Sequence, residues 1–129
     1  MMTLLRILAG GLGTGLPGLG VGWLLAPGFA AAQLGMTLLD GAGLASQISD
    51  GAGYFVTLGW CILLGLSRRD RRWFYPAISL LGGATLGRLS AWLVHGASLT
   101  VGMILFEVVL IGLLIVIARW LRPDPAPSA

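Results

Sequence analysis

The fold is decided by residues 73–121, WFYPAISLLGGATLGRLSAWLVHGASLTVGMILFEVVLIGLLIVIARWL. This stretch is apolar enough to lie in a lipid bilayer, but it contains two charged residues, Arg88 and Glu107, far from either end. A charged side chain inside a bilayer costs at least about 2.5–3.5 kcal/mol on insertion scales, so it needs a partner or a function. The stretch therefore predicts a helical membrane protein with a polar site inside its bundle.

This stretch can be divided into membrane spans in two ways. A single span between Arg88 and Glu107 would leave fragments on both sides that are shorter than the roughly 20 residues a crossing helix needs. It would also bury residues 95–98, His-Gly-Ala-Ser, which are typical of a turn. We therefore expect spans at about 73–94 and 99–121, and both charged residues then lie within spans.

The composition supports the same class for the whole chain. The 129 residues are 57% hydrophobic and 10% charged, whereas a soluble domain carries about 25% charged residues. Four spans with their loops use almost the full length. The prediction is an all-α bundle of four transmembrane helices in a single domain, residues 1–121, followed by a disordered cytoplasmic tail at 122–129.

Pro27 divides the uncharged region near the N-terminus, because proline ends a helix. The first two spans are then expected at about 4–26 and 48–66. Residues 28–45 would form a loop, with a short helical piece around 30–39. The first span exceeds the 7–15 apolar residues typical of a signal peptide, which disfavours that alternative. Four tryptophans lie near expected span ends, as in an interfacial aromatic belt: Trp23, Trp73, Trp92 and Trp120.

The arginines predict the orientation of the bundle. If the loop after the second span is cytoplasmic, seven of the eight arginines lie on that side, and the eighth is Arg88. Cytoplasmic loops are enriched in basic residues, so both termini are expected in the cytoplasm. The absence of Lys and Asn, together with 21 Gly, indicates a bacterial inner-membrane protein. Anionic lipid headgroups, rather than nucleic acid, are the expected partners of the loop residues Arg68, Arg69, Arg71 and Arg72.

Glycines crowd the first expected span around Pro17. Residues 13–18 formally match the dinucleotide fingerprint GxGxxG, but no strand precedes them, so no cofactor is expected. Glycines four residues apart let helix backbones approach closely in membranes. This spacing predicts helix-packing positions at Gly11, Gly15, Gly18 and Gly22 in the first span and at Gly83 and Gly87 in the third.

The depth of the two intramembrane charges predicts a salt bridge. Arg88 lies seven residues before His95, and Glu107 lies seven residues after Thr100. At about 1.5 Å per residue, both are roughly 10 Å from the outer ends of antiparallel spans, so they should be level. Asp50 enters the second span from the same side and shares a helix face with Tyr54, and His95 would lie at the mouth. We expect a polar cluster of Asp50, Tyr54, Arg88, His95 and Glu107.

Two roles for this cluster remain open. A buried Arg–carboxylate pair often does no more than fix helix register, whereas intramembrane ionisable groups also mark ligand or proton pathways. Catalysis is not expected, because no Ser or Cys has a base at a usable spacing. No metal site is expected either, since the chain lacks the spacing of His and Cys that such sites use.

Residues 86–96, LGRLSAWLVHG, and the following Phe106-Glu107 resemble an uncharacterised family of small bacterial four-helix integral membrane proteins, a domain of unknown function. The resemblance implies the four-span topology and the pairing of an Arg with a Glu, and it implies no activity. The family's second Arg, soon after the acid of span two, has no counterpart in residues 51–57, GAGYFVT. The family pattern of a Pro, an acid, a Gly-Arg and a Glu in successive spans corresponds to Pro27, Asp50, Gly87-Arg88 and Glu107.

Two functions are compatible with these features. The first is a non-enzymatic membrane protein that binds a small ligand or lipid headgroup at the outward-facing polar cluster. The second is an accessory or assembly subunit of a larger membrane complex, or a homo-oligomer, with the cluster purely structural. A binding protein needs a cavity beside Arg88 and Glu107, whereas an accessory subunit needs an exposed apolar face rich in glycine.

Overall fold

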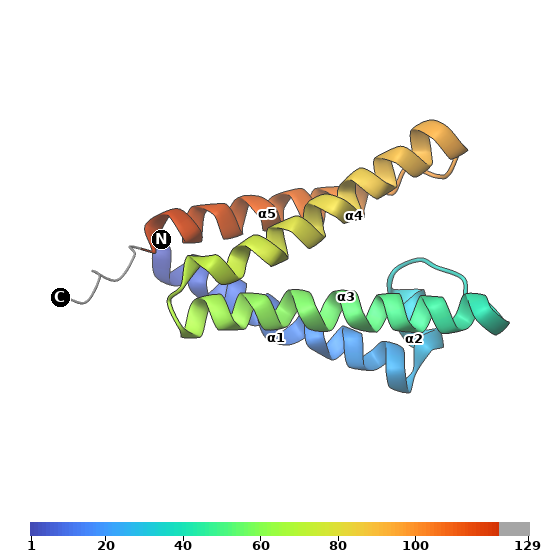
Figure 1. The fold of residues 1–129 in the computed structure, drawn as a ribbon, viewed down its shortest axis with the longest axis horizontal. Helices are drawn as coiled ribbons and strands as arrows, with labels where there is room; N and C mark the ends of the chain where they lie inside the picture. The colour runs from blue at the N-terminus through green and yellow to red at the C-terminus, as the bar shows by residue number, and fades with distance from the viewer. Residues whose placement is uncertain (122–129) are drawn as a thin grey trace.

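The computed structural model describes residues 1–121, which are helical throughout apart from short connections (Figure 1). The predicted disordered tail at 122–129, with Arg122, lies outside the described residues. In chain order the elements are α1 (Met2–Leu25), α2 (Pro27–Gln33), α3 (Gly41–Ser67), the short 3-10 helix η1 (Arg71–Trp73), α4 (Phe74–His95) and α5 (Val101–Trp120).

Four of these helices are long and apolar enough to cross a membrane, namely α1, α3, α4 with η1, and α5. The chain therefore has the features of an integral membrane protein, as its composition predicts. The turn expected between the last two spans is present, and α4 ends at Gly96, whose φ of 65° is the left-handed conformation that glycine adopts readily.

The region before the second span differs from the prediction. The short helix α2 occupies Pro27–Gln33, with Pro27 at its first position, rather than residues 30–39. Helix α3 begins at Gly41, seven residues before the expected start at residue 48, and continues for 27 residues. Polar residues in its first turns conceal this start, because a hydropathy pattern detects only the apolar part of a helix. The loop is thus limited to residues 34–40.

The helices form two hairpins, α1 with α3 and α4 with α5 (Figure 1). The hairpins lie together at the end that holds the N-terminus and diverge toward the other end, where the loop after α2 rises between them. Residues from all four long helices form the shared core, including the fully buried Leu58, Phe74, Leu81 and Leu114. Arg6, Arg119 and the arginines of the α3–η1 connection lie at the joined end.

The α1–α3 seam is the most extensive helix–helix contact within residues 1–121. The buried positions of α1 alternate at spacings of four and three residues, which is the pattern of left-handed helix pairs. At its centre Pro17 of α1 lies against Gly59 of α3, where any Cβ would collide with the proline ring. Proline removes the N–H that would bond to the carbonyl four residues earlier, here that of Gly13. Gly59 lets α3 cover this carbonyl, since a Cβ at Gly59 would lie 2.8 Å from the Gly13 oxygen.

The glycine prediction needs correction at this seam. The seam glycines at which a Cβ would lie within 3.0 Å of the partner helix are Gly13, Gly20, Gly51 and Gly59. By contrast, a Cβ would meet no heavy atom within 4 Å at any of the six predicted positions, Gly11, Gly15, Gly18, Gly22, Gly83 and Gly87. Helix α1 is apolar on every side, so glycine spacing alone does not show which face packs against α3. The contact of Pro17 with Gly59, which covers the Gly13 carbonyl, identifies the face that packs against α3.

Candidate ligand-binding site

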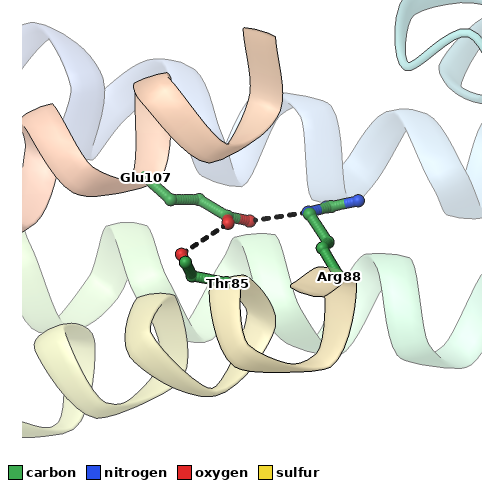
Figure 2. Close-up of polar contacts among 3 residues, drawn as sticks. All are labelled: Thr85, Arg88 and Glu107. Carbon is green, nitrogen blue, oxygen red and sulfur yellow. Dashed lines mark hydrogen bonds and ion pairs between the residues drawn. The ribbon is translucent and has the colours of Figure 1, made fainter. Parts of the chain in front are cut away.

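Arg88 and Glu107 are joined by an ion pair between α4 and α5 (Figure 2). The Arg88 Nε donates a hydrogen bond to Oε1 of Glu107 at 3.1 Å. The Thr85 hydroxyl donates to the other carboxylate oxygen, Oε2, at 2.8 Å. The Glu107 side chain is 4% exposed and that of Arg88 is 31% exposed. Both oxygens of a buried carboxylate therefore have a partner, which offsets the cost of taking the charge out of water.

The local sequence of each helix explains this arrangement. Thr85 and Arg88 are three residues apart on α4, so they lie on one face of the helix and reach the same carboxylate. Glu107 occupies the buried face of α5, at the alternating spacing of three and four residues that continues through Leu110, Leu114 and Ile117. A core position is thus filled by a carboxylate, and the adjacent helix supplies both of its donors.

The far end of the Arg88 guanidinium points away from Glu107 (Figure 2). Within residues 1–121, the hydrogen bonds of this group involve Nε, and neither Nη atom has a partner. A guanidinium carries five N–H donors in a planar fork. The ion pair uses one of them, and the remaining donors stay available on the side away from α5.

That side of Arg88 borders a cavity of about 500 Å³ between the two hairpins. The α1–α3 hairpin contributes Trp23, Asp50 and Tyr54 to its wall, and the other hairpin contributes Arg88 and Met103. An adjoining cavity of about 300 Å³ is lined by Arg88, Tyr54 and Glu107 as well as by apolar residues. Arg88 and Tyr54 line both cavities, so the ion pair lies at their junction. Volumes in this range are those of small-molecule sites.

Two residues that line the larger cavity carry donors covered by protein atoms. The Trp23 indole N–H and the Tyr54 hydroxyl are buried and have no hydrogen-bond partner among the described residues. Trp23 is 1% exposed, and it packs against Gly51 of α3, where a Cβ would lie 2.6 Å from the indole nitrogen. The prediction that Trp23 belongs to an interfacial belt is therefore wrong for this residue. The feature of the sequence that could have indicated this burial is Gly51, which has no side chain and leaves room for the indole ring.

The other members of the predicted cluster lie as follows. Asp50 is exposed and lines the larger cavity together with Arg88, but it forms no ion pair in residues 1–121. His95 is exposed in the last turn of α4 and lines neither cavity. It lies two turns from Arg88 along a helix that diverges from the other hairpin (Figure 1). Arg88, Glu107, Tyr54 and Asp50 thus surround one site, and His95 is separate from it.

Gln47 attaches the loop before α3 to the mouth of the cavity. The Leu39 backbone N–H donates to the Gln47 side-chain oxygen, and the Gln47 amide donates to the Thr37 carbonyl, each at 3.0 Å. Gln47 and Leu39 both line the larger cavity, together with Met36 from the same loop. A single side chain therefore holds this loop over the site. Nothing in the sequence pattern distinguishes Gln47 from the other polar residues near it.

The polar groups of the site are suited to binding a ligand. It offers one guanidinium and one exposed carboxylate on mainly apolar walls. No group of three His, Cys, Asp or Glu side chains that would hold a metal ion occurs in the described part of the chain. Comparison of the chain with protein-family models, with curated proteins and with solved structures finds no match.

Proposed function

We propose that this chain is a non-enzymatic protein of the bacterial inner membrane that binds a small molecule or a lipid headgroup between its two hairpins. The observation that carries the proposal is the 500 Å³ cavity bordered by both Arg88 and Asp50. Cavities of this size with mainly apolar walls and a few convergent polar groups are the usual form of a ligand site. Membership of the four-helix membrane family that the sequence resembles is part of the same proposal.

The proposed orientation places the cavity on the outer side of the membrane, with both termini in the cytoplasm. It is supported by Arg6, Arg119 and the loop arginines, which share one end of the bundle. Basic residues favour the cytoplasmic side, where anionic headgroups would contact Arg68, Arg69, Arg71 and Arg72. The mouth beside Asp50 belongs to the opposite end.

In this proposal the residues of the site have different roles. Thr85 and Glu107 hold the Arg88 side chain in one orientation through two hydrogen bonds to the carboxylate. Arg88 then presents its remaining N–H groups to the ligand. A charged group inside a bilayer is expected to be paired or functional, and Arg88 is both, because its pairing occupies only Nε.

Native mass spectrometry of the protein extracted gently from its own membranes tests this proposal. We expect a small-molecule or lipid adduct that Arg88→Gln removes. Since this change leaves Glu107 without its cation, the double variant Arg88→Gln/Glu107→Gln should be measured beside it. The matched control is Arg6→Gln, an exposed arginine at the joined end of α1. Wild-type protein without any adduct, or an adduct kept by both Arg88 variants, would overturn the proposal.

A second candidate function is that of an accessory subunit or a homo-oligomer. It is favoured by the exposed face of α1 at Gly11, Gly15 and Gly18, where neighbouring atoms of the described chain are more than 4 Å from an added Cβ. Such faces allow close helix contacts in membranes. The same spectra distinguish the two functions, because a stoichiometric protein companion without a small adduct supports this one. Gly15→Leu should then release the companion.

A further inference from the structure

We propose that the ligand is a zwitterion, with an oxygen-rich anionic group held by Arg88 and an ammonium group held by Asp50. This inference rests on the proposed function and names its ligand class. The chemistry is that of a phosphate ester adjacent to a primary amine, as in an ethanolamine phosphate. Such a group occurs both on membrane lipids and in soluble molecules.

The Arg88 guanidinium has donors available to an acceptor in the cavity. The two Nη atoms of Arg88 have no hydrogen-bond partner within residues 1–121, and the Arg88 side chain is 31% exposed. A group with several negatively charged oxygens would accept hydrogen bonds from these nitrogens, and a planar guanidinium suits phosphate and carboxylate well.

The charges of the cavity require a cation as well. Arg88 is already neutralised by Glu107 at 3.1 Å, so the remaining formal charge of the site is the negative charge of Asp50. A purely anionic ligand would add a second negative charge beside this carboxylate. A purely cationic ligand would leave the outer donors of Arg88 without an acceptor from the ligand. A zwitterion matches both parts of the wall, because its anion meets the donors and its ammonium meets Asp50.

The walls also fit an amphiphile. Apart from these polar groups the larger cavity is lined mainly by apolar side chains, among them Leu34, Met36, Leu39 and Phe55. The adjoining 300 Å³ cavity extends the apolar surface toward Leu16, Leu19 and Phe106. A headgroup at the polar wall would therefore place attached hydrocarbon against these side chains.

The test uses the full-length protein in detergent, titrated separately with phosphatidylethanolamine and phosphatidylglycerol of matched acyl chains, with adducts measured by native mass spectrometry. A charge-assisted hydrogen bond contributes enough for a preference of about tenfold. We expect the ethanolamine lipid to bind about tenfold more tightly. In Asp50→Asn this preference should fall to nearly one. In the matched control Asp40→Asn, an exposed aspartate that does not line the cavity, it should be unchanged.

A soluble competitor identifies the source of the ligand. Displacement of the lipid by glycerophosphoethanolamine at comparable concentration supports a soluble zwitterion, whereas retention of the lipid supports a membrane lipid. Asp50 is exposed and makes no side-chain hydrogen bond in residues 1–121, so Asp50→Asn should keep the wild-type unfolding temperature. This measurement accompanies each titration.

The outcomes separate the two proposals. Equal binding of both lipids, or a preference that Asp50→Asn leaves intact, overturns the zwitterion while Arg88-dependent binding still supports the function. Binding of neither lipid nor of glycerophosphoethanolamine also overturns the zwitterion. If the protein extracted from its own membranes carries no adduct that depends on Arg88, the function itself fails.

Discussion

Arg88 reaches Glu107 through Nε, 3.1 Å from Oε1, so the ion pair leaves the outer end of the guanidinium for other partners. A side-on pair differs in this respect from a bidentate one, in which the fork of the guanidinium is directed at the carboxylate. Glu107 serves as the holder, and Arg88 remains a donor to the cavity. The stability of the site and its capacity to bind therefore depend on different atoms of one residue.

Removing Arg88 alone should destabilise the bundle more than removing both charges. Arg88→Gln leaves the nearly buried Glu107 with only Thr85 as a partner. We expect a loss of roughly 2–3 kcal/mol, somewhat below the range for fully buried pairs because Arg88 is 31% exposed. Arg88→Gln/Glu107→Gln should lose less. Thermal unfolding in detergent measures both, and equal losses for the single and double variants would contradict the pairing.

The Thr85 hydroxyl should contribute measurably to the same site. Thr85→Val keeps the shape of the side chain but removes the donor to Oε2 of Glu107. A hydrogen bond to a charged group is worth more than a neutral one, so we expect a loss of about 1.5–3 kcal/mol. Thr57→Val is the matched control, since Thr57 is exposed and has no side-chain hydrogen bond in the described region. Similar unfolding temperatures for the two variants would count against the Thr85 contact.

Substitution by alanine at two glycines of α3 should have different effects on the stability of the bundle. Gly59→Ala forces a Cβ against Pro17 and the Gly13 carbonyl, neither of which is a flexible side-chain end. Overpacking of this kind costs about 1–3 kcal/mol. Gly53→Ala places its Cβ in open space and should leave stability unchanged or raise it by less than about 1 kcal/mol. Unfolding temperatures rank the two, and a stable Gly59→Ala would show that the seam is looser than described.

Gln47 should control the mobility of the loop over the cavity. Gln47→Ala removes both hydrogen bonds to the loop. We expect hydrogen exchange of the Leu39 amide to become faster. Gln47→Glu keeps the acceptor for that amide but loses the donor to the Thr37 carbonyl, so its effect at Leu39 should be smaller. Gln33→Ala, an exposed glutamine of α2, is the control. Unchanged exchange in Gln47→Ala would mean that other contacts hold the loop.

Cysteine labelling in intact cells checks the proposed orientation. Cys61 is the lone cysteine of the chain and is buried, so Cys61→Ala provides a background without thiols. In that background Ser98→Cys, in the loop after α4, should react with a membrane-impermeant maleimide. Ser67→Cys, next to the arginine-rich loop, should react only after the membrane is permeabilised. The reverse pattern would place the cavity on the cytoplasmic side.

The long helices could be predicted from the sequence, but their contact faces could not. Four apolar stretches of membrane-spanning length are interrupted by turns and by the arginine cluster, and these signals are local. The face of α1 is not a local property, because an all-apolar helix has no polar side to orient it. The contact of Pro17 with Gly59 decides that face, and it depends on two helices at once.

The candidate site could be predicted only in part, because local signals in the sequence identify some of its residues and not others. Charges in an apolar stretch are conspicuous, and depth along antiparallel helices brings Arg88 and Glu107 together. Thr85 follows only from the geometry of the pair. Trp23 and Gln47 belong to the site through a cavity whose walls come from both hairpins and a loop. Depth along the helix alone predicts that His95 lies at the mouth. The hairpins diverge toward that end, so His95 is separate from the site (Figure 1).

Both partners of the Glu107 carboxylate come from α4, the helix that precedes it in the same hairpin. Arg88 and Glu107 therefore neutralise each other within the second hairpin, and this ion pair does not require the first hairpin to be present. Helices in membranes insert before they associate. During synthesis, each hairpin of this chain can thus enter the bilayer as a separate unit. Neither Arg88 nor Glu107 needs a residue of the first hairpin to neutralise its charge. The cavity is the last feature to form, since it exists only after the two halves have met.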